Sequence, residues 1–163
     1  MSRLITLTQG QSAIVDDDQY EWLSRFLWYA HEEPKNSGKF RALRNICIGE
    51  KWTVIYMHVA IAKRINLQGE IDHRNTNTLD NRIENLRSAT KSQNQANRGP
   101  PKNNKTGFKG VSWDKRSSKY RAVIGVNGKL LHCGYFDHPE EAAMAYDLAA
   151  TKYFGKFART NFV

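Results

Sequence analysis

The clearest pattern of apolar and polar residues lies in the last third of the chain, where it predicts a small sheet. Apolar side chains alternate with polar ones over residues 108–113, 119–126 and 129–136, which is the pattern of half-buried strands. The pair Asn127-Gly128 lies between the second and third runs and is a strong signal for a tight type I′ hairpin turn. We therefore expect three short antiparallel strands in this region.

A helix is expected directly after these strands. Asp137 is its expected N-cap, with Pro139 in the first turn and Glu140 three residues after the cap, and Gly155 is its expected end. Mostly small residues follow at helical spacing on one face: Ala142, Ala145, Tyr146, Ala149, Ala150 and Tyr153. Because small side chains allow a helix to approach a sheet closely, the pattern predicts three antiparallel strands packed on one helix.

The first seventy residues give a more mixed pattern. A hairpin is expected about Gln9-Gly10, followed by an amphipathic helix that the aspartates at residues 16–18 cap and that runs to Phe26. Further expected elements are strands over residues 28–30, 40–48 and 53–57 and a helix over residues 57–65. Three aromatic residues are expected in the core: Trp22, Phe26 and Trp28.

Three polar residues in this region have two interpretations each. Arg41 and Arg44 either touch DNA or form an exposed strand face. His58 begins the expected helix, and we expect a structural role for it, since a lone histidine is more often a satisfied polar group than a site residue.

The segment over residues 71–98 brings together the residue types of a metal-dependent nuclease. Asp72 and His73 close an apolar, strand-like run, Asn85-Leu86 opens a second run after a polar loop, and Asn94 lies in an expected helix. Carboxylate and amide oxygens are hard ligands suited to Mg²⁺, and a histidine can deprotonate an attacking water. An alternative stays open, because an Asp-His pair and an asparagine-rich loop are also typical of turns.

This segment resembles the HNH (ββα-metal) endonuclease family of phage or homing type, with Asn94 where many members have the last histidine. The resemblance implies that His73 is the general base and that Asp72 and Asn94 hold one Mg²⁺ or Mn²⁺ ion per active site. It also implies that Asn85 braces the loop behind His73. In that family these residues form the catalytic set: Asp72, His73, Asn85 and Asn94.

The last third of the chain resembles the plant ethylene-response-factor (APETALA-type) DNA-binding domain, through the stretches FKGVSW, KYRAVI, GYFDHPEEAAMAYDLAATKYFG and ARTNF. The resemblance implies that one face of the sheet enters the major groove. Alternation directs Tyr120, Ala122 and Ile124 toward the helix and Lys119, Arg121 and Val123 outward. Lys109 and His132 on the neighbouring strands are expected to face outward too. The expected DNA-contacting residues are Lys109, Trp113, Lys115, Arg116, Lys119, Arg121 and His132.

The outward-facing residues also have interpretations other than DNA contact. The outer face of an antiparallel sheet is commonly polar and solvated, and Trp113 is as well suited to a core as to a DNA contact. Ser112 and Asp114 stand where the plant domains usually have arginines, so the base preference of those domains does not carry over.

Composition supports nucleic acid as the partner. The chain of 163 residues carries 25 Lys and Arg against 16 Asp and Glu, a formal charge of +9. Cys47 and Cys133 are far apart and give neither a zinc motif nor a disulfide framework. No stretch has the length of a membrane span or of the apolar core of a signal peptide, so we expect a cytoplasmic protein. The resemblance to phage-type HNH proteins implies that the cell is a phage-infected bacterial host.

The sequence therefore predicts an α+β protein that binds double-stranded DNA and uses neither a membrane nor a small-molecule cofactor. An HNH nuclease module with a β-rich leader is expected over residues 1–98, a linker over 99–106, and the three-stranded DNA-binding domain over 107–163. The activity expected is hydrolysis of DNA phosphodiester bonds, by nicking or by double-strand cleavage. The main alternative is a non-catalytic, repressor-like DNA-binding protein, and an RNA-binding protein is less favoured because a paired aromatic platform is missing.

Overall fold

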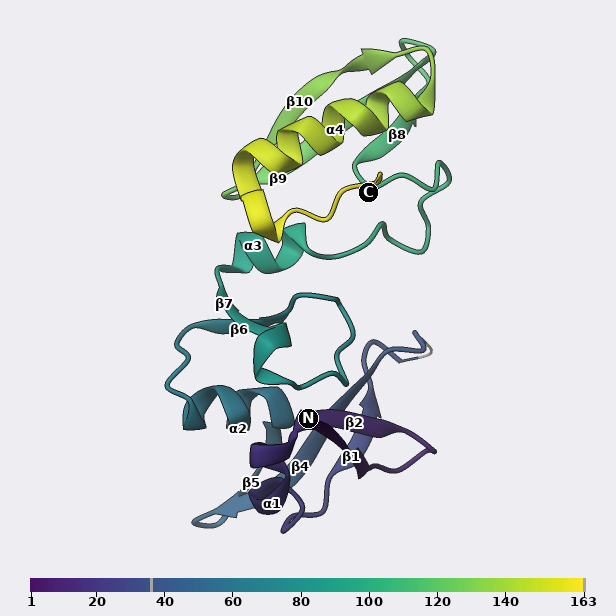
Figure 1. The fold of residues 1–163 in the computed structure, drawn as a ribbon. Helices are drawn as coiled ribbons and strands as arrows, with labels where there is room; N and C mark the ends of the chain where they lie inside the picture. The colour runs from purple at the N-terminus through teal and green to yellow at the C-terminus, as the bar shows by residue number, and fades with distance from the viewer. Residues whose placement is uncertain (36, 163) are drawn as a thin grey trace. The chain divides into compact units, whose positions relative to one another are not determined.

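The structure is a computed structural model that describes residues 1–35 and 37–162 (Figure 1). It is a mixed α and β protein, and its contacts divide it into two compact units, Met1–Ala89 and Thr90–Val163. The division falls ahead of the expected linker, so that the helix carrying Asn94 groups with the second unit. None of the described helices is long and apolar enough to cross a membrane.

The first unit consists of small antiparallel sheets and short helices. Its elements are β1 (Ser2–Thr6), β2 (Ser12–Asp16), α1 (Asp17–Leu23), β3 (Tyr29–Glu32), β4 (Phe40–Ile48), β5 (Lys51–Tyr56), α2 (Met57–Arg64), β6 (Glu70–His73), the 3-10 turn η1 (Ile83–Asn85) and β7 (Leu86–Ala89). β1 pairs with β2, β4 lies between β3 and β5, and β6 pairs with β7. The expected hairpin turn is confirmed, with Gln9 and Gly10 both at positive φ.

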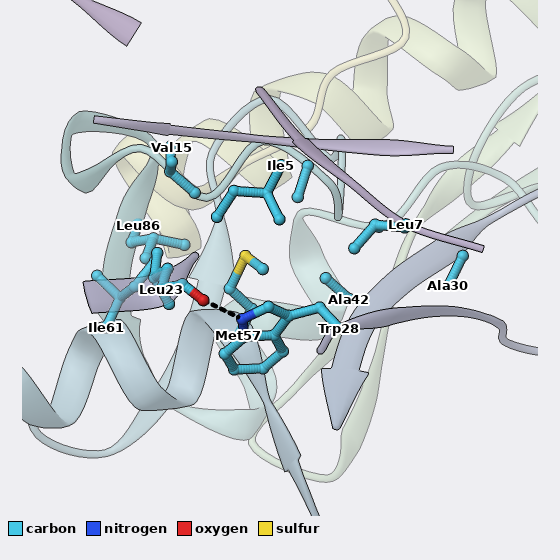
Figure 2. Packing of buried hydrophobic residues seen from close by; sticks show 11 residues of the cluster. Ile5, Leu7, Val15, Leu23, Trp28, Ala30, Ala42, Met57, Ile61 and Leu86 are labelled. Atoms are coloured by element: carbon cyan, nitrogen blue, oxygen red, sulfur yellow. Dashed lines mark hydrogen bonds between the residues drawn. The ribbon is translucent and has the colours of Figure 1, made fainter. Parts of the chain in front are cut away.

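The core of the first unit draws buried or partly buried side chains from all of these elements (Figure 2). Leu23, Met57 and Ile61 are fully buried, and Trp28 donates from Nε1 to the carbonyl of Leu23 at 2.9 Å. Burial of each such large side chain contributes about 1.5–3 kcal/mol. Because this core packs against β7 through Leu86, it supports the strand pair that carries the Asp-His motif.

Three details of the leader differ from expectation. The helix ends at Leu23 rather than at Phe26. Asp16 stands at the N-cap position as expected, but its carboxylate makes no capping hydrogen bond and accepts instead from the backbone N–H of Ile83 at 2.6 Å. Phe26 is exposed rather than in the core, and the guanidinium of Arg44 lies over its ring. Trp28 is in the core as expected.

The second unit contains one three-stranded sheet covered by a helix (Figure 1). Its elements are α3 (Lys91–Ala96), β8 (Val111–Asp114), β9 (Lys119–Val126), β10 (Lys129–Phe136), α4 (Pro139–Phe154) and the 3-10 turn η2 (Gly155–Phe157). The strands are antiparallel in the order β10-β9-β8, and Asn127 and Gly128 have the positive φ of the expected type I′ turn. The expected three strands on one helix are therefore present.

Close packing of α4 on the sheet depends on small residues. Ala142, Ala143 and Ala150 of α4 are buried. A Cβ atom added at Gly110 would lie 2.1 Å from the ring of Tyr146. Two details differ from expectation: Phe154 rather than Tyr153 completes the buried stripe, and His138 rather than Asp137 precedes the first helical residue. The carboxylate of Asp137 instead forms an ion pair with Lys119 at 3.1 Å.

Candidate active site

The Asp-His pair lies at the end of β6, where the first unit's core holds it. Asp72 and His73 are the last two residues of the strand, and they pair across it with Arg87 and Leu86 of β7. Both residues are buried, with about 5% of the surface of each exposed. Neighbouring residues on a regular strand point to opposite faces, so two such residues can reach the same side only where the strand ends, which is where this pair lies.

Asp72 is held in a buried ion pair. Its Oδ2 accepts from Nε of Arg87 at 2.8 Å and from Nη2 at 2.7 Å. Both side chains are shielded from solvent, so the pair fixes the plane and position of the carboxylate. Arg87 is a residue that sequence reasoning missed, although its place opposite Asp72 follows once the two strands are paired in register.

His73 is a buried imidazole with one defined partner in the loop that follows it. Its Nε2 lies 3.2 Å from Oδ1 of Asn81, a side chain with no solvent exposure. Burial lowers the pKa of His73 below its ordinary value, against the opposing effect of the hydrogen bond to Asn81. The ring is therefore neutral at neutral pH, as a general base has to be.

His58 forms one wall of this site. Its ring meets that of His73 edge to face, with the centroids 5.0 Å apart, and the tilted ring of Tyr56 lies 5.6 Å from it. Burial, and then the charges of His73 and Arg41, lowers the pKa of His58 to about 3. A ring that stays neutral and buried agrees with the structural role expected for it.

The loop behind His73 is braced by Asn85. The side chain of Asn85 accepts from the backbone N–H of Asn75 at 3.0 Å and donates to the carbonyl of Asp80 at 2.7 Å. The bracing contacts expected of Asn85 are therefore present. The turn interpretation also holds, since Asn75 and Asn77 each accept from a backbone N–H two residues on.

Asn94 lies on α3, in the second unit. Thr90 caps this short helix, because its hydroxyl accepts from the backbone N–H of Gln93 while the Gln93 side chain accepts from Thr90 N–H. At the other end, the carbonyl of Ala96 accepts from Nζ of Lys109 and from the backbone N–H of Arg159. α3 is thus fixed at both ends by contacts within residues 90–162.

The outer face of the second unit's sheet carries exposed polar and aromatic side chains. Arg121 is exposed and stands between its cross-strand partners Ser112 and Tyr135. The exposed ring of His132 packs on Tyr135, with centroids 4.5 Å apart. The alternation expected on β9 is confirmed for Ala122 and Ile124, which are buried, and for Arg121.

The remaining residues expected to touch DNA lie in three different settings. Lys115 and Arg116 are exposed in the turn between β8 and β9, where Asp114 accepts from the Arg116 N–H at 3.1 Å. Lys119 begins β9 and is engaged with Asp137. Trp113 is about half exposed and meets Tyr120 edge to face, so it is neither core nor fully outward.

The expectation that Lys109 faces outward is wrong. Lys109 precedes β8, so strand alternation does not govern its direction. Its Nζ lies over the Tyr146 ring and donates to Ala96, and its backbone N–H donates to the side chain of Asn161 at 2.6 Å. Burial, and then the charge of Arg159, lowers the pKa of Lys109 to about 8.

Comparisons with known proteins agree with both resemblances. An HNH endonuclease family model matches residues 57–96, and an AP2 domain model matches residues 106–156. An uncharacterized HNH endonuclease of Acanthamoeba polyphaga mimivirus is 30% identical over 157 residues, which cover 94% of this chain and 76% of the relative. The chain belongs to the HNH endonuclease family.

Two further relatives of this HNH family chain each match one part of it. Protein 3.8 of Escherichia phage T7 is 35% identical over 89 residues, which cover 55% of this chain and 73% of the relative. An AP2-like ethylene-responsive transcription factor of Arabidopsis thaliana is 36% identical over 63 residues, which cover 39% of this chain and 13% of the relative. The chain thus joins an HNH endonuclease match to an AP2 domain match.

The donors of the HNH segment fit a magnesium ion in kind. Asp72 supplies a carboxylate and Asn94 an amide oxygen, both of the hard oxygen type that Mg²⁺ and Mn²⁺ prefer. Within residues 1–35 and 37–162, no group of three or more His, Cys, Asp and Glu gathers in a metal-binding arrangement. Mg²⁺ usually keeps several waters and takes one or two protein carboxylates.

Proposed function

We propose that this HNH family chain is a divalent-metal-dependent DNA endonuclease that hydrolyses phosphodiester bonds. The observation that carries the proposal is the buried, neutral imidazole of His73 at the end of β6, next to the fixed carboxylate of Asp72. A base in this setting can take the proton of an attacking water, a contribution of about 10²- to 10⁴-fold in rate.

Each residue of the site has a proposed role. Asp72 and Asn94 would hold one Mg²⁺ or Mn²⁺ ion, which would neutralise charge on the scissile phosphate and on the leaving oxygen. His73 would receive the proton of the water that attacks phosphorus. Asn85 would keep the loop rigid through its contacts to Asn75 and Asp80, so that the base does not drift from the phosphate.

The AP2-like unit is proposed to hold duplex DNA. Arg121 and His132 offer donors on the exposed sheet face, and Lys115 and Arg116 offer positive charge at its edge. The overall charge of +9 favours the same partner. The relatives from a mimivirus and a phage support action on DNA within an infected host cell.

A second candidate function is DNA binding without cleavage. The observation that favours it is the Asp72–Arg87 ion pair, because a guanidinium on the carboxylate competes with a metal for the same oxygen. Under this alternative the HNH segment would serve only as a folded element.

Cleavage of supercoiled plasmid distinguishes the two candidates. The parental chain is expected to convert plasmid to nicked circles with Mg²⁺ or Mn²⁺ and to leave it intact with chelator. His73→Ala is expected to lose about 10²-fold or more of this activity while it keeps its DNA affinity. If purified parental protein binds DNA but leaves plasmid intact with either metal, the non-catalytic alternative is correct.

A further inference from the structure

The side chain amide of Asn81 has a defined orientation. Its Nδ2 lies 3.3 Å from the carbonyl oxygen of Leu79 and 3.6 Å from Sδ of Met57, and both of these atoms can only accept hydrogen bonds. The amide nitrogen must therefore face Leu79, and the amide oxygen must face Nε2 of His73.

The backbone of Asn81 is fixed as firmly as its side chain. The N–H of Asn81 donates to the carbonyl of Ile14 on β2 at 2.8 Å, and the N–H of Ile14 donates to Leu79 at 2.8 Å. These bonds make a parallel bridge between Ile14 and Asp80. With no solvent exposure at Asn81, a turned amide would set its oxygen against the carbonyl oxygen of Leu79, and two acceptors would then face each other with no hydrogen between them.

This orientation selects one tautomer of the neutral imidazole. An amide oxygen accepts hydrogen bonds and cannot donate them, so the hydrogen between the two side chains has to belong to Nε2 of His73. The lone pair of the neutral ring is then on Nδ1. A fixed hydrogen bond on one ring nitrogen also sets the direction of the other, as it does where histidines serve as bases or metal ligands.

We infer that Asn81 is a positioning residue that holds His73 in the Nε2–H tautomer and presents Nδ1 as the nitrogen that accepts the proton of the attacking water. The catalytic consequence rests on the proposed function, whereas the tautomer itself does not. In the step, the O–H bond of the water breaks, its proton passes to Nδ1, and its oxygen forms the new bond to phosphorus as the leaving oxygen departs.

The tautomer can be measured directly on the parental protein. Long-range ¹H–¹⁵N correlation spectra of the full chain at neutral pH report which ring nitrogen carries hydrogen, and His73→Ala identifies the His73 signals by their loss. We expect a protonated Nε2 and a lone pair on Nδ1. A folded parental chain with hydrogen on Nδ1 of His73 overturns the inference, and this arm needs no variant at Asn81 to fold.

Variants at Asn81 then test positioning. Asn81→Leu removes the acceptor, and we expect a mixture of His73 tautomers. The cleavage rate should fall by about 10-fold or more, but by no more than it falls in His73→Ala. Asn81→Asp keeps an oxygen acceptor, and we expect it to retain the Nε2–H signal. Ile61→Val, which trims the same core, is the matched control for loss of stability and is expected to leave the His73 spectrum and the rate unchanged.

The outcomes separate this inference from the proposed function. If His73→Ala abolishes cleavage while folded Asn81→Leu cuts at the parental rate, positioning by Asn81 is wrong and the nuclease proposal stands. If no variant or parental chain cleaves DNA but the Nε2–H tautomer is found, the nuclease proposal fails and the structural part of the inference stands.

Discussion

Arg87 donates two hydrogen bonds to a single oxygen of Asp72, and the two residues face each other across β6 and β7. The pair is buried, so each charge depends on the other for compensation. Because both contacts of the guanidinium fall on Oδ2 of Asp72, the pair also restricts which side of the carboxylate can face a metal ion.

Removal of Arg87 is expected to destabilise the first unit strongly. Arg87→Leu leaves the Asp72 carboxylate buried without its partner, a change that costs about 3–5 kcal/mol in comparable buried pairs. Urea denaturation followed by circular dichroism measures the loss. Asp72→Asn combined with Arg87→Leu removes both charges and is expected to recover part of the stability; a single variant as stable as the parent would contradict the assigned pairing.

Asn94 is expected to affect metal use rather than folding. Asn94→Ala removes one of few proposed protein ligands, so the Mg²⁺ concentration for half-maximal cleavage should rise or activity should disappear. Titration of plasmid cleavage against Mg²⁺ measures this, with the exposed Gln95→Ala on the same helix as control. Identical curves for Asn94→Ala and the parent would remove Asn94 from the metal site.

His58 is expected to make stability sensitive to acid. Its pKa is lowered from 6.5 to about 3 in the folded chain, so between these values the unfolded chain binds the additional proton. The stability associated with neutral His58 is complete above pH 6.5 and declines as the pH falls toward 3. Melting temperatures from pH 7.5 to pH 4.5 should fall less steeply for His58→Phe than for the parent. Equal slopes for both would show that His58 is not the group responsible.

Salt dependence should separate surface lysines from Lys109. Lys115→Ala and Arg116→Ala each remove an exposed charge, and each is expected to reduce the slope of log affinity against log salt by about one if it neutralises a phosphate. Lys109→Met should leave that slope unchanged, since its ammonium is turned toward Ala96 and Tyr146. Fluorescence anisotropy on a labelled duplex gives the slopes. A lower slope for Lys109→Met would return Lys109 to the DNA interface.

Fragments should fold best when they include α3. A fragment of residues 90–163 keeps the hydrogen bonds to the Ala96 carbonyl. A fragment of residues 107–163 lacks α3 and therefore lacks both these bonds and the packing of the buried Ala96 side chain. We expect both fragments to bind duplex DNA and the shorter one to melt at a lower temperature, by the equivalent of about 1–3 kcal/mol. Calorimetry compares the two, and equal melting temperatures would show that α3 adds nothing to this unit.

The sequence predicted best where local rules decide the structure. β9 and β10 have the predicted bounds, because alternation and the Asn127-Gly128 turn fix their register. Asp137 failed as a cap because α4 begins at Pro139, which puts His138 at the cap position and Asp137 one residue ahead of it. Lys109 failed because it lies just outside the strand whose alternation was applied to it.

The candidate site was predicted in part for the same reason. Asp72, His73 and Asn85 could be found because their order along the chain carries the motif. Asn81 could not, since its relation to His73 depends on a loop that returns to β2 through the Ile14–Asp80 bridge. A contact of this kind is set by tertiary structure and leaves no periodic trace in the sequence.

The place of α3 has a consequence for recombination between genes of the HNH family. The HNH family match extends to residue 96, yet the contacts of α3 belong with the AP2-like unit, so the two modules overlap rather than meet end to end. A chimera that exchanges the AP2-like module should therefore carry residues 90–96 with it. An incoming module joined after residue 98 would need its own donor for the Ala96 carbonyl, at the position where this chain has Lys109.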